Sequence, residues 1–149
     1  LEDLAPFIDA ANVDVKAFTK DFYSKICMVR DFKSILDAIV YMKEHGIHVE
    51  ITNLKLPGLN DSEEETRELS KWILDNLGPD VPLHITRFYP HYKMLDLDPT
   101  PVETLVRARR VALETGLNYV YTGNIPGEPG ENTYCPKCGE ELIVRYGFI

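Results

Sequence analysis

The sequence has few cysteines, no long apolar run and no excess of basic residues. Its three cysteines in 149 residues are too few for the disulfide framework of a small secreted domain, so they favour a reducing, cytoplasmic environment. No segment approaches the roughly 18 consecutive apolar residues of a membrane-spanning helix. The formal net charge of -8 argues against nucleic acid or an anionic membrane as the main partner. The 44% hydrophobic content is enough for one globular domain with a core.

A repeating pattern of short apolar strand, polar turn and helix runs through most of the chain. Candidate strands begin 35 residues apart, near Val13, His48, Leu83 and Asn118. This spacing suits a strand, a loop and a crossover helix, so it predicts an α/β fold of βα units with parallel strands. In such folds ligands bind at the C-terminal ends of the strands, where the polar turns at 14–16, 56–61 and 88–93 fall.

Three helices are marked by capping residues and by apolar side chains at helical spacing. They are predicted from residue 32, with Asp31 as cap, to Gly46; from Ser62, with Glu65 completing a capping box, to Gly78; and from Thr100 as cap, with Pro101 at the first helical position, to Gly116. Each pattern combines an N-cap with a terminating glycine.

Alternation along the strands predicts that one face of the sheet is polar. The side chains that would point away from the helices are Glu50, Thr52, His84 and Thr86. A parallel sheet covered on both faces would be apolar throughout. Because a closed eight-stranded barrel needs about 250 residues, we predict half of an open, TIM-like barrel whose interior holds a ligand.

Several residues at the strand ends could carry chemistry. Asp14 and Lys16 leave the same face of one strand, where a carboxylate beside an ammonium could orient a zwitterionic ligand or form a structural ion pair. The turn from Pro57 to Asp61 feeds a helix N-terminus and could bind an anion or act only as a turn. His91 could be a general acid or base, or a solvated loop histidine.

Residues 124–149 differ from the βα units of residues 1–123. A loop rich in Gly, Pro, Asn and Glu leads to Cys135-Pro136-Lys137-Cys138-Gly139, which is typical of one half of a zinc knuckle and less typical of a redox pair. A complete knuckle needs two more ligands, and none occurs at a usual spacing. The chain also opens with a pattern like the last turn of a helix, so we expect an N-terminal part to precede it.

Taken in order, three segments resemble radical S-adenosylmethionine (SAM) enzymes of the pyruvate formate-lyase activating enzyme group. They are residues 12–18 (Asn-Val-Asp-Val-Lys-Ala-Phe), residues 51–61, ending in Pro-Gly-Leu-Asn-Asp, and residues 87–90 (Arg-Phe-Tyr-Pro). The similarity is strongest to the branch found beside AMMECR1- and Memo-type proteins, which the tail at residues 121–139 also resembles.

The resemblance implies a partial (β/α)6 barrel in which a [4Fe-4S] cluster held by CxxxCxxC cleaves SAM reductively to a 5′-deoxyadenosyl radical. In the activating enzymes that radical abstracts hydrogen from a glycine of a partner protein. Asp14 and Lys16 match the Asp-x-Lys pair near the methionine moiety of SAM. Thr52 stands where these activators carry an arginine that contacts SAM, and His91 lies one residue short of a histidine beside it. Arg87, in the third segment, completes the expected cofactor-binding set.

The CxxxCxxC motif and the Gly-rich SAM strand do not occur in these 149 residues. We therefore expect the chain to be the C-terminal half of such an enzyme, inactive without its N-terminal half and acting on a substrate or a protein partner. Exposed strand edges, or the tail, would make the isolated half self-associate. Two alternatives are a non-enzymatic α/β binding or assembly module with a zinc-knuckle tail, and an aldolase-like half barrel with Lys16 as a Schiff-base amine.

Overall fold

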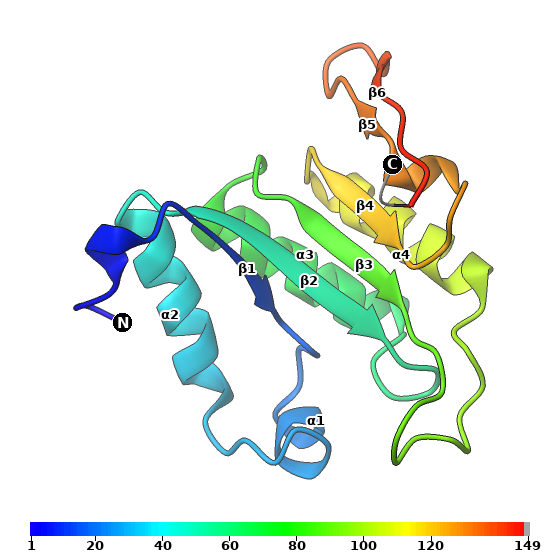
Figure 1. Ribbon diagram of the computed structural model, residues 1–149, viewed down its shortest axis with the longest axis horizontal. Helices are drawn as coiled ribbons and strands as arrows, with labels where there is room; N and C mark the ends of the chain where they lie inside the picture. The colour runs from blue at the N-terminus through cyan, green and yellow to red at the C-terminus, as the bar shows by residue number, and fades with distance from the viewer. Residues whose placement is uncertain (148–149) are drawn as a thin grey trace.

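A four-stranded parallel sheet forms the centre of the structure, a computed structural model that describes residues 1–147. Its strands follow one another in space as they do in sequence: β1 (Ala10–Asp14), β2 (His48–Lys55), β3 (Leu83–Arg87) and β4 (Val120–Gly123). The α/β class and the parallel strands predicted from the 35-residue spacing are confirmed. Because the strands run in parallel, their carboxyl ends meet at one edge of the sheet (Figure 1).

Helices cover one face of this sheet. They are α2 (Phe32–Glu44), α3 (Glu63–Leu77) and α4 (Val102–Thr115), preceded by the short α1 (Lys20–Lys25) and a 3-10 turn, η1 (Ala5–Phe7). Figure 1 shows α3 and α4 behind the sheet, whereas no helix of the described residues crosses its near face. Within residues 1–147, no helix combines the length and apolarity that crossing a bilayer requires.

The core lies between the sheet and these helices. Val49 and Ile51 of β2 and Leu83 and Ile85 of β3 are each at most 1% exposed, and they pack against apolar side chains of α2, α3 and α4. The intervening strand residues, which point to the near face, are half-buried. The alternation predicted from the sequence is therefore present, and it leaves one face of the sheet polar and open.

Two of the predicted helix starts hold and one is wrong. The hydroxyl of Ser62 accepts a hydrogen bond from the backbone N–H of Glu65 at 3.1 Å, and the Asp31 carboxylate accepts one from Ser34 at 3.2 Å. Thr100 does not cap α4, which begins at Val102 after Pro101. Its hydroxyl is buried and bonds Lys55 and Phe88 in neighbouring segments, because those backbone groups have lost contact with water.

The tail is attached to the β4 side of the sheet. After β4 the chain forms a second 3-10 turn, η2 (Pro129–Glu131), and then a hairpin of β5 (Thr133–Tyr134) and β6 (Glu141–Ile143), which pair in antiparallel fashion. In Figure 1 this hairpin projects away from the body of the domain.

Candidate functional site

An ion pair stands at the carboxyl edge of the sheet. Lys16 Nζ lies 2.9 Å from Asp14 Oδ1, and the two side chains are 41% and 51% exposed. Asp14 ends β1 and is in register with Thr52 of β2, whose hydroxyl donates to Asn12 Oδ1 at 2.7 Å. One cation, one anion and one hydroxyl thus share the open rim of the polar face.

The backbone beneath this pair is fixed by side chains from three other segments. Asn53 donates to the carbonyl of Val15 at 2.7 Å, and Asn60 donates to the carbonyl of Lys16 at 2.6 Å. The N–H of Lys16 donates to the hydroxyl of Tyr23 in α1 at 2.9 Å. The main chain that carries the pair is therefore held on both sides, while the charged ends of Asp14 and Lys16 stay exposed.

Asn60 also shapes the turn between β2 and α3. Its Oδ1 accepts from the N–H of Leu56 at 2.6 Å, and its Nδ2 donates to the carbonyl of Leu54 at 2.8 Å. Asp61 accepts from the N–H of Gly58 at 2.9 Å. The backbone N–H groups of Leu56 and Gly58 thus already have side-chain acceptors. This segment therefore serves as a structural turn that supports Lys16.

Lys55, the last residue of β2, is buried beneath the same turn. Lys55 is only 1% exposed. Its Nζ donates to the carbonyl of Asn60 at 3.1 Å and to the hydroxyl of Thr66 at 2.9 Å. Burial lowers the pKa of Lys55 to about 8, against the opposing attraction of Glu65 and Asp61. The lysine therefore ties the strand end to the start of α3 and does not face a ligand.

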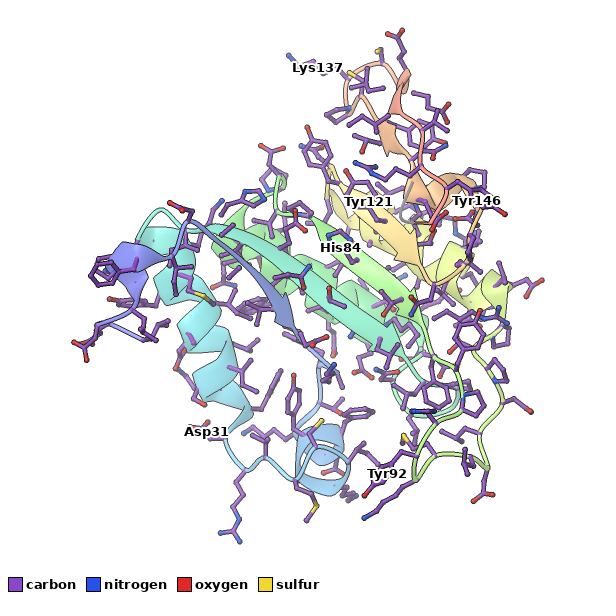
Figure 2. The ribbon with its side chains drawn as sticks, in the orientation of Figure 1. Asp31, His84, Tyr92, Tyr121, Lys137 and Tyr146 are labelled. Atoms are coloured by element: carbon purple, nitrogen blue, oxygen red, sulfur yellow. The ribbon has the colours of Figure 1, made fainter. Side chains whose placement is uncertain are left out.

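A second group of polar side chains lies on the open face of the central strands. His84 Nε2 is 2.8 Å from Glu50 Oε2, and the His84 ring stacks on Tyr121 with centres 5.3 Å apart. Figure 2 shows His84 and Tyr121 on the near face of the sheet. Burial raises the pKa of Glu50, but hydrogen bonds from His84 and His48 outweigh it, so the pKa lies below its usual value.

A cleft of about 860 Å³ opens over β3 and β4 beside these residues. Its lining includes His84, Thr86, Tyr89, Tyr121, Asn124 and Arg145. Arg145 comes from the tail, donates to Thr133 Oγ1 at 2.7 Å and places its guanidinium carbon 5.4 Å from the centre of the Tyr121 ring. The tail thereby forms one wall of the cleft, a role that the sequence did not reveal.

The structure brings only part of the predicted cofactor-binding set together. Asp14, Lys16 and Thr52 share the rim. Arg87 donates from Nε to the carbonyl of Thr100 at 2.7 Å and from Nη1 to the Tyr89 hydroxyl at 3.0 Å, so it braces the loop that borders the cleft. His91 is exposed in that loop and is not among the residues that line the cleft.

Cys135 and Cys138 lie at the tip of the tail hairpin, apart from the rim and the cleft. The N–H of Gly139 donates to the carbonyl of Cys135 at 2.9 Å, which closes the turn between them. Backbone hydrogen bonds from Cys138 and Lys137 hold the pKa of the Cys135 thiol below its usual value. Across residues 1–147, no three Cys, His, Asp or Glu side chains are grouped as a metal site would require.

Known proteins resemble the chain both in sequence and in structure. No protein-family model matches the chain. An uncharacterized protein of Methanocaldococcus jannaschii is 48% identical over 141 residues, which cover 95% of this chain and 42% of that protein. The chain therefore spans less than half the length of this relative.

Two of the solved structures that resemble the chain are a domain of an activating enzyme and a radical SAM methyltransferase. A domain of pyruvate-formate lyase-activating enzyme from Bacteroides vulgatus ATCC 8482 has a TM-score of 0.70 at 14% identity, covering 83% of this chain and 72% of that one. A radical SAM methyltransferase from Sphaerobacter thermophilus has a TM-score of 0.64 at 19% identity, covering 86% and 41%. The chain thus has a fold shared with radical SAM proteins, in agreement with the fold that the strand-end motifs predicted.

Proposed function

We propose that this chain is the SAM-binding, C-terminal part of a radical SAM enzyme of the activating-enzyme type. The observation that carries the proposal is the exposed Asp14–Lys16 pair at the carboxyl edge of a parallel sheet with this fold. The proposal goes beyond the structural likeness, because proteins that share a fold can differ in function and the site must supply the argument.

The residues at the rim fit the chemistry of SAM. The methionine end of SAM is a zwitterion, for which Lys16 offers a cation to the carboxylate and Asp14 an anion to the ammonium. Thr52, beside Asp14, offers a hydroxyl to a ligand hydroxyl or amine. Both charged side chains are about half exposed, so a ligand reaches them without breaking a buried ion pair.

A [4Fe-4S] cluster, when bound, supplies the reductive cleavage of SAM to a 5′-deoxyadenosyl radical. The CxxxCxxC motif that would hold this cluster does not occur in these 149 residues. This chain would bind and orient SAM through its rim. The adjacent 860 Å³ cleft, with His84, Tyr121 and Arg145 in its wall, is where we place the substrate or a protein segment. The chain alone would therefore be inactive.

The open edge of β1 is where an N-terminal half would join. β1 pairs with β2 on one side, and no other strand among residues 1–147 pairs with its outer edge. An unpaired edge presents free N–H and C=O groups that favour addition of another strand. We propose that the N-terminal half supplies this strand, and that the isolated chain self-associates in its place.

The test is SAM binding by the purified chain, measured by equilibrium dialysis. Asp14→Ala and Lys16→Ala should each weaken binding about tenfold or more, since one charge-assisted contact contributes about 1.5–3 kcal/mol. Lys25→Ala is the matched control, because Lys25 pairs with Asp21 at 2.6 Å on the surface of α1 but lies outside the rim. Equal SAM affinity in all variants would contradict the proposal, and no saturable binding would favour a non-enzymatic module.

A further inference from the structure

The guanidinium of Arg145 belongs to the wall of the cleft over β3 and β4, and only neutral groups hold it there. Its Nη1 donates to the carbonyl of Glu131 at 3.0 Å and to the hydroxyl of Thr133 at 2.7 Å. Its guanidinium carbon lies 5.4 Å from the centre of the Tyr121 ring. Arg145 forms no ion pair with a carboxylate of residues 1–147. The side chain is therefore held in place without a counter-charge from this part of the chain.

Two carboxylates line the same cleft, and both have partners other than Arg145. Glu50 Oε2 lies 2.8 Å from His84 Nε2. Glu131 Oε2 accepts from the backbone N–H of Gly127 at 3.0 Å. Because both carboxylates are satisfied without Arg145, the positive charge of the guanidinium is left for a ligand.

Much of the remaining cleft wall is apolar or aromatic. Pro82, Tyr89, Tyr121 and Pro126 contribute to it, and the ring of His84 stacks on that of Tyr121 with centres 5.3 Å apart. Figure 2 shows His84 and Tyr121 on the open face of the sheet. Clefts that bind small molecules enclose about 300–1,000 Å³ and combine such walls with a few polar groups that orient the ligand. The volume of about 860 Å³ falls within this range.

We propose that the cleft binds a small carboxylic acid as its monoanion, with the carboxylate on Arg145 and an apolar body against the tyrosines and prolines of the wall. A guanidinium presents its N–H groups in pairs that match the two oxygens of a carboxylate. Neither Nε nor Nη2 of Arg145 donates a hydrogen bond within residues 1–147, so this edge can form such a pair. The assignment rests on the proposed function, which places the substrate in this cleft, and it names the class of that substrate.

The charges around the cleft favour one negative charge on the ligand over two. Glu50 and Glu131 line the same cleft as Arg145, and each would repel a dianion such as phosphate more strongly than a monoanion. A carboxylate therefore suits this cleft better than a phosphate group does.

The first test uses the whole 149-residue chain and three probes: benzoate, benzamide and inorganic phosphate. Benzoate should shift the NMR signal of the Arg145 Nε–H saturably. Benzamide, which has the same ring but no charge, should bind about tenfold more weakly or worse, because it lacks a charge-assisted contact. Phosphate should not displace benzoate at equal concentration. No saturable shift with benzoate, equal affinity for benzamide, or displacement by phosphate would each overturn the proposal.

Variants then test whether Arg145 is the group that binds the carboxylate. Arg145→Gln should weaken benzoate binding about tenfold or more, and Arg145→Lys, which keeps the charge but loses the paired N–H groups, should lose less. Arg109→Gln is the matched control. Arg109 also has neutral partners, the carbonyl of Val120 at 2.9 Å and the Tyr134 ring centre at 5.8 Å, but it is outside the cleft lining. Benzoate affinity as high in Arg145→Gln as in Arg109→Gln would refute the role of Arg145.

Two further readouts separate the possible causes of failure. Far-UV circular dichroism and the unfolding midpoint show whether Arg145→Gln folds, and the comparison of benzoate with benzamide in the parent chain needs no variant. SAM binding by equilibrium dialysis should be unchanged in Arg145→Gln, because Arg145 is not part of the rim. SAM binding without benzoate binding would refute the carboxylate site alone, whereas benzoate binding without SAM binding would refute the rim proposal alone.

Discussion

Replacing Asn60 with alanine would remove a buried side chain that joins two segments beneath the Asp14–Lys16 pair. Asn60 is 1% exposed. Its amide accepts from the N–H of Leu56 and donates to the carbonyls of Leu54 and Lys16, at 2.6, 2.8 and 2.6 Å. Alanine would leave these three backbone groups without their partner, in a place where water has poor access.

The expected loss follows from that count. A hydrogen bond contributes about 0.5–1.5 kcal/mol net, and a buried group left unpaired costs more than the average bond. Three such bonds give about 2–4 kcal/mol of destabilisation, after allowance for some water entering the vacated space. Urea unfolding measures this as a lower midpoint with an unchanged slope. SAM affinity should fall as well, because the carbonyl of Lys16 loses its anchor.

Asn76→Ala is the matched control. Asn76 is exposed on α3, and its side chain donates one hydrogen bond, to the carbonyl of Trp72 at 2.8 Å. Surface substitutions of this kind usually change stability by less than about 0.5 kcal/mol. If Asn60→Ala were as stable as Asn76→Ala, the claim that Asn60 organises the rim would be refuted.

Three further perturbations test other parts of the structure. Burial lowers the pKa of Lys55 from 10.5 to about 8, so between these values the unfolded chain binds more protons. The free energy of unfolding of the parent should therefore rise from pH 8 to 10 relative to that of Lys55→Met, by about 2 kcal/mol in urea titrations. Burial is the largest single influence on the pKa of Glu50 and raises it, but the hydrogen bonds and the charge attraction from His84 and His48 together bring the pKa below its usual value. The stability advantage of the parent over His84→Phe, under about 1 kcal/mol for this partly exposed pair, should therefore shrink as pH falls below about 4.5. In Gly130→Ala the new Cβ would collide with the Glu128 carboxylate and the Thr122 hydroxyl; we expect about 1–3 kcal/mol of destabilisation and faster proteolysis of the tail.

The features predicted correctly from the sequence are those that local patterns encode. The polar face follows from a period of two, which places Glu50, Thr52 and His84 on one side whatever the rest of the chain does. The start of α3 follows from Ser62, because its hydroxyl caps the helix by accepting from the backbone N–H of the residue three positions later. The parallel direction of the strands follows from the regular spacing of 35 residues, which leaves room for a crossover helix between successive strands.

Long-range hydrogen bonds could not be read from the same patterns. Thr100 stands before Pro101 and three residues ahead of Glu103, which is locally a good cap, yet its hydroxyl donates to the carbonyl of Lys55, 45 residues away. Likewise Asn60 looked like a turn residue, and its bond to Lys16 spans 44 residues. Which acceptor a buried hydroxyl or amide finds depends on packing that no single segment specifies.

Glu65 shows the same competition between a local and a distant partner. Its position after Ser62 predicted that its carboxylate would return to the start of α3, but Oε1 accepts instead from the N–H of Phe18 at 2.6 Å. The helix start keeps one half of the capping box, through the Ser62 hydroxyl. The other half fixes the segment that follows Lys16, so α3 is coupled to the rim.

The exposure of the polar face restricts what can cover it. Asp14, Lys16 and Glu50 carry charges that water solvates in this chain, and their side chains are between 34% and 51% exposed. Burying a charge without a replacement partner costs several kcal/mol. An apolar ligand or strand laid over these residues would therefore bind poorly.

A zwitterionic ligand replaces the lost hydration at Asp14 and Lys16 with charge-assisted contacts. The rim should therefore discriminate SAM from an analogue that lacks the methionine carboxylate and ammonium. Equal affinity for the two would show that the rim pair does not orient the ligand.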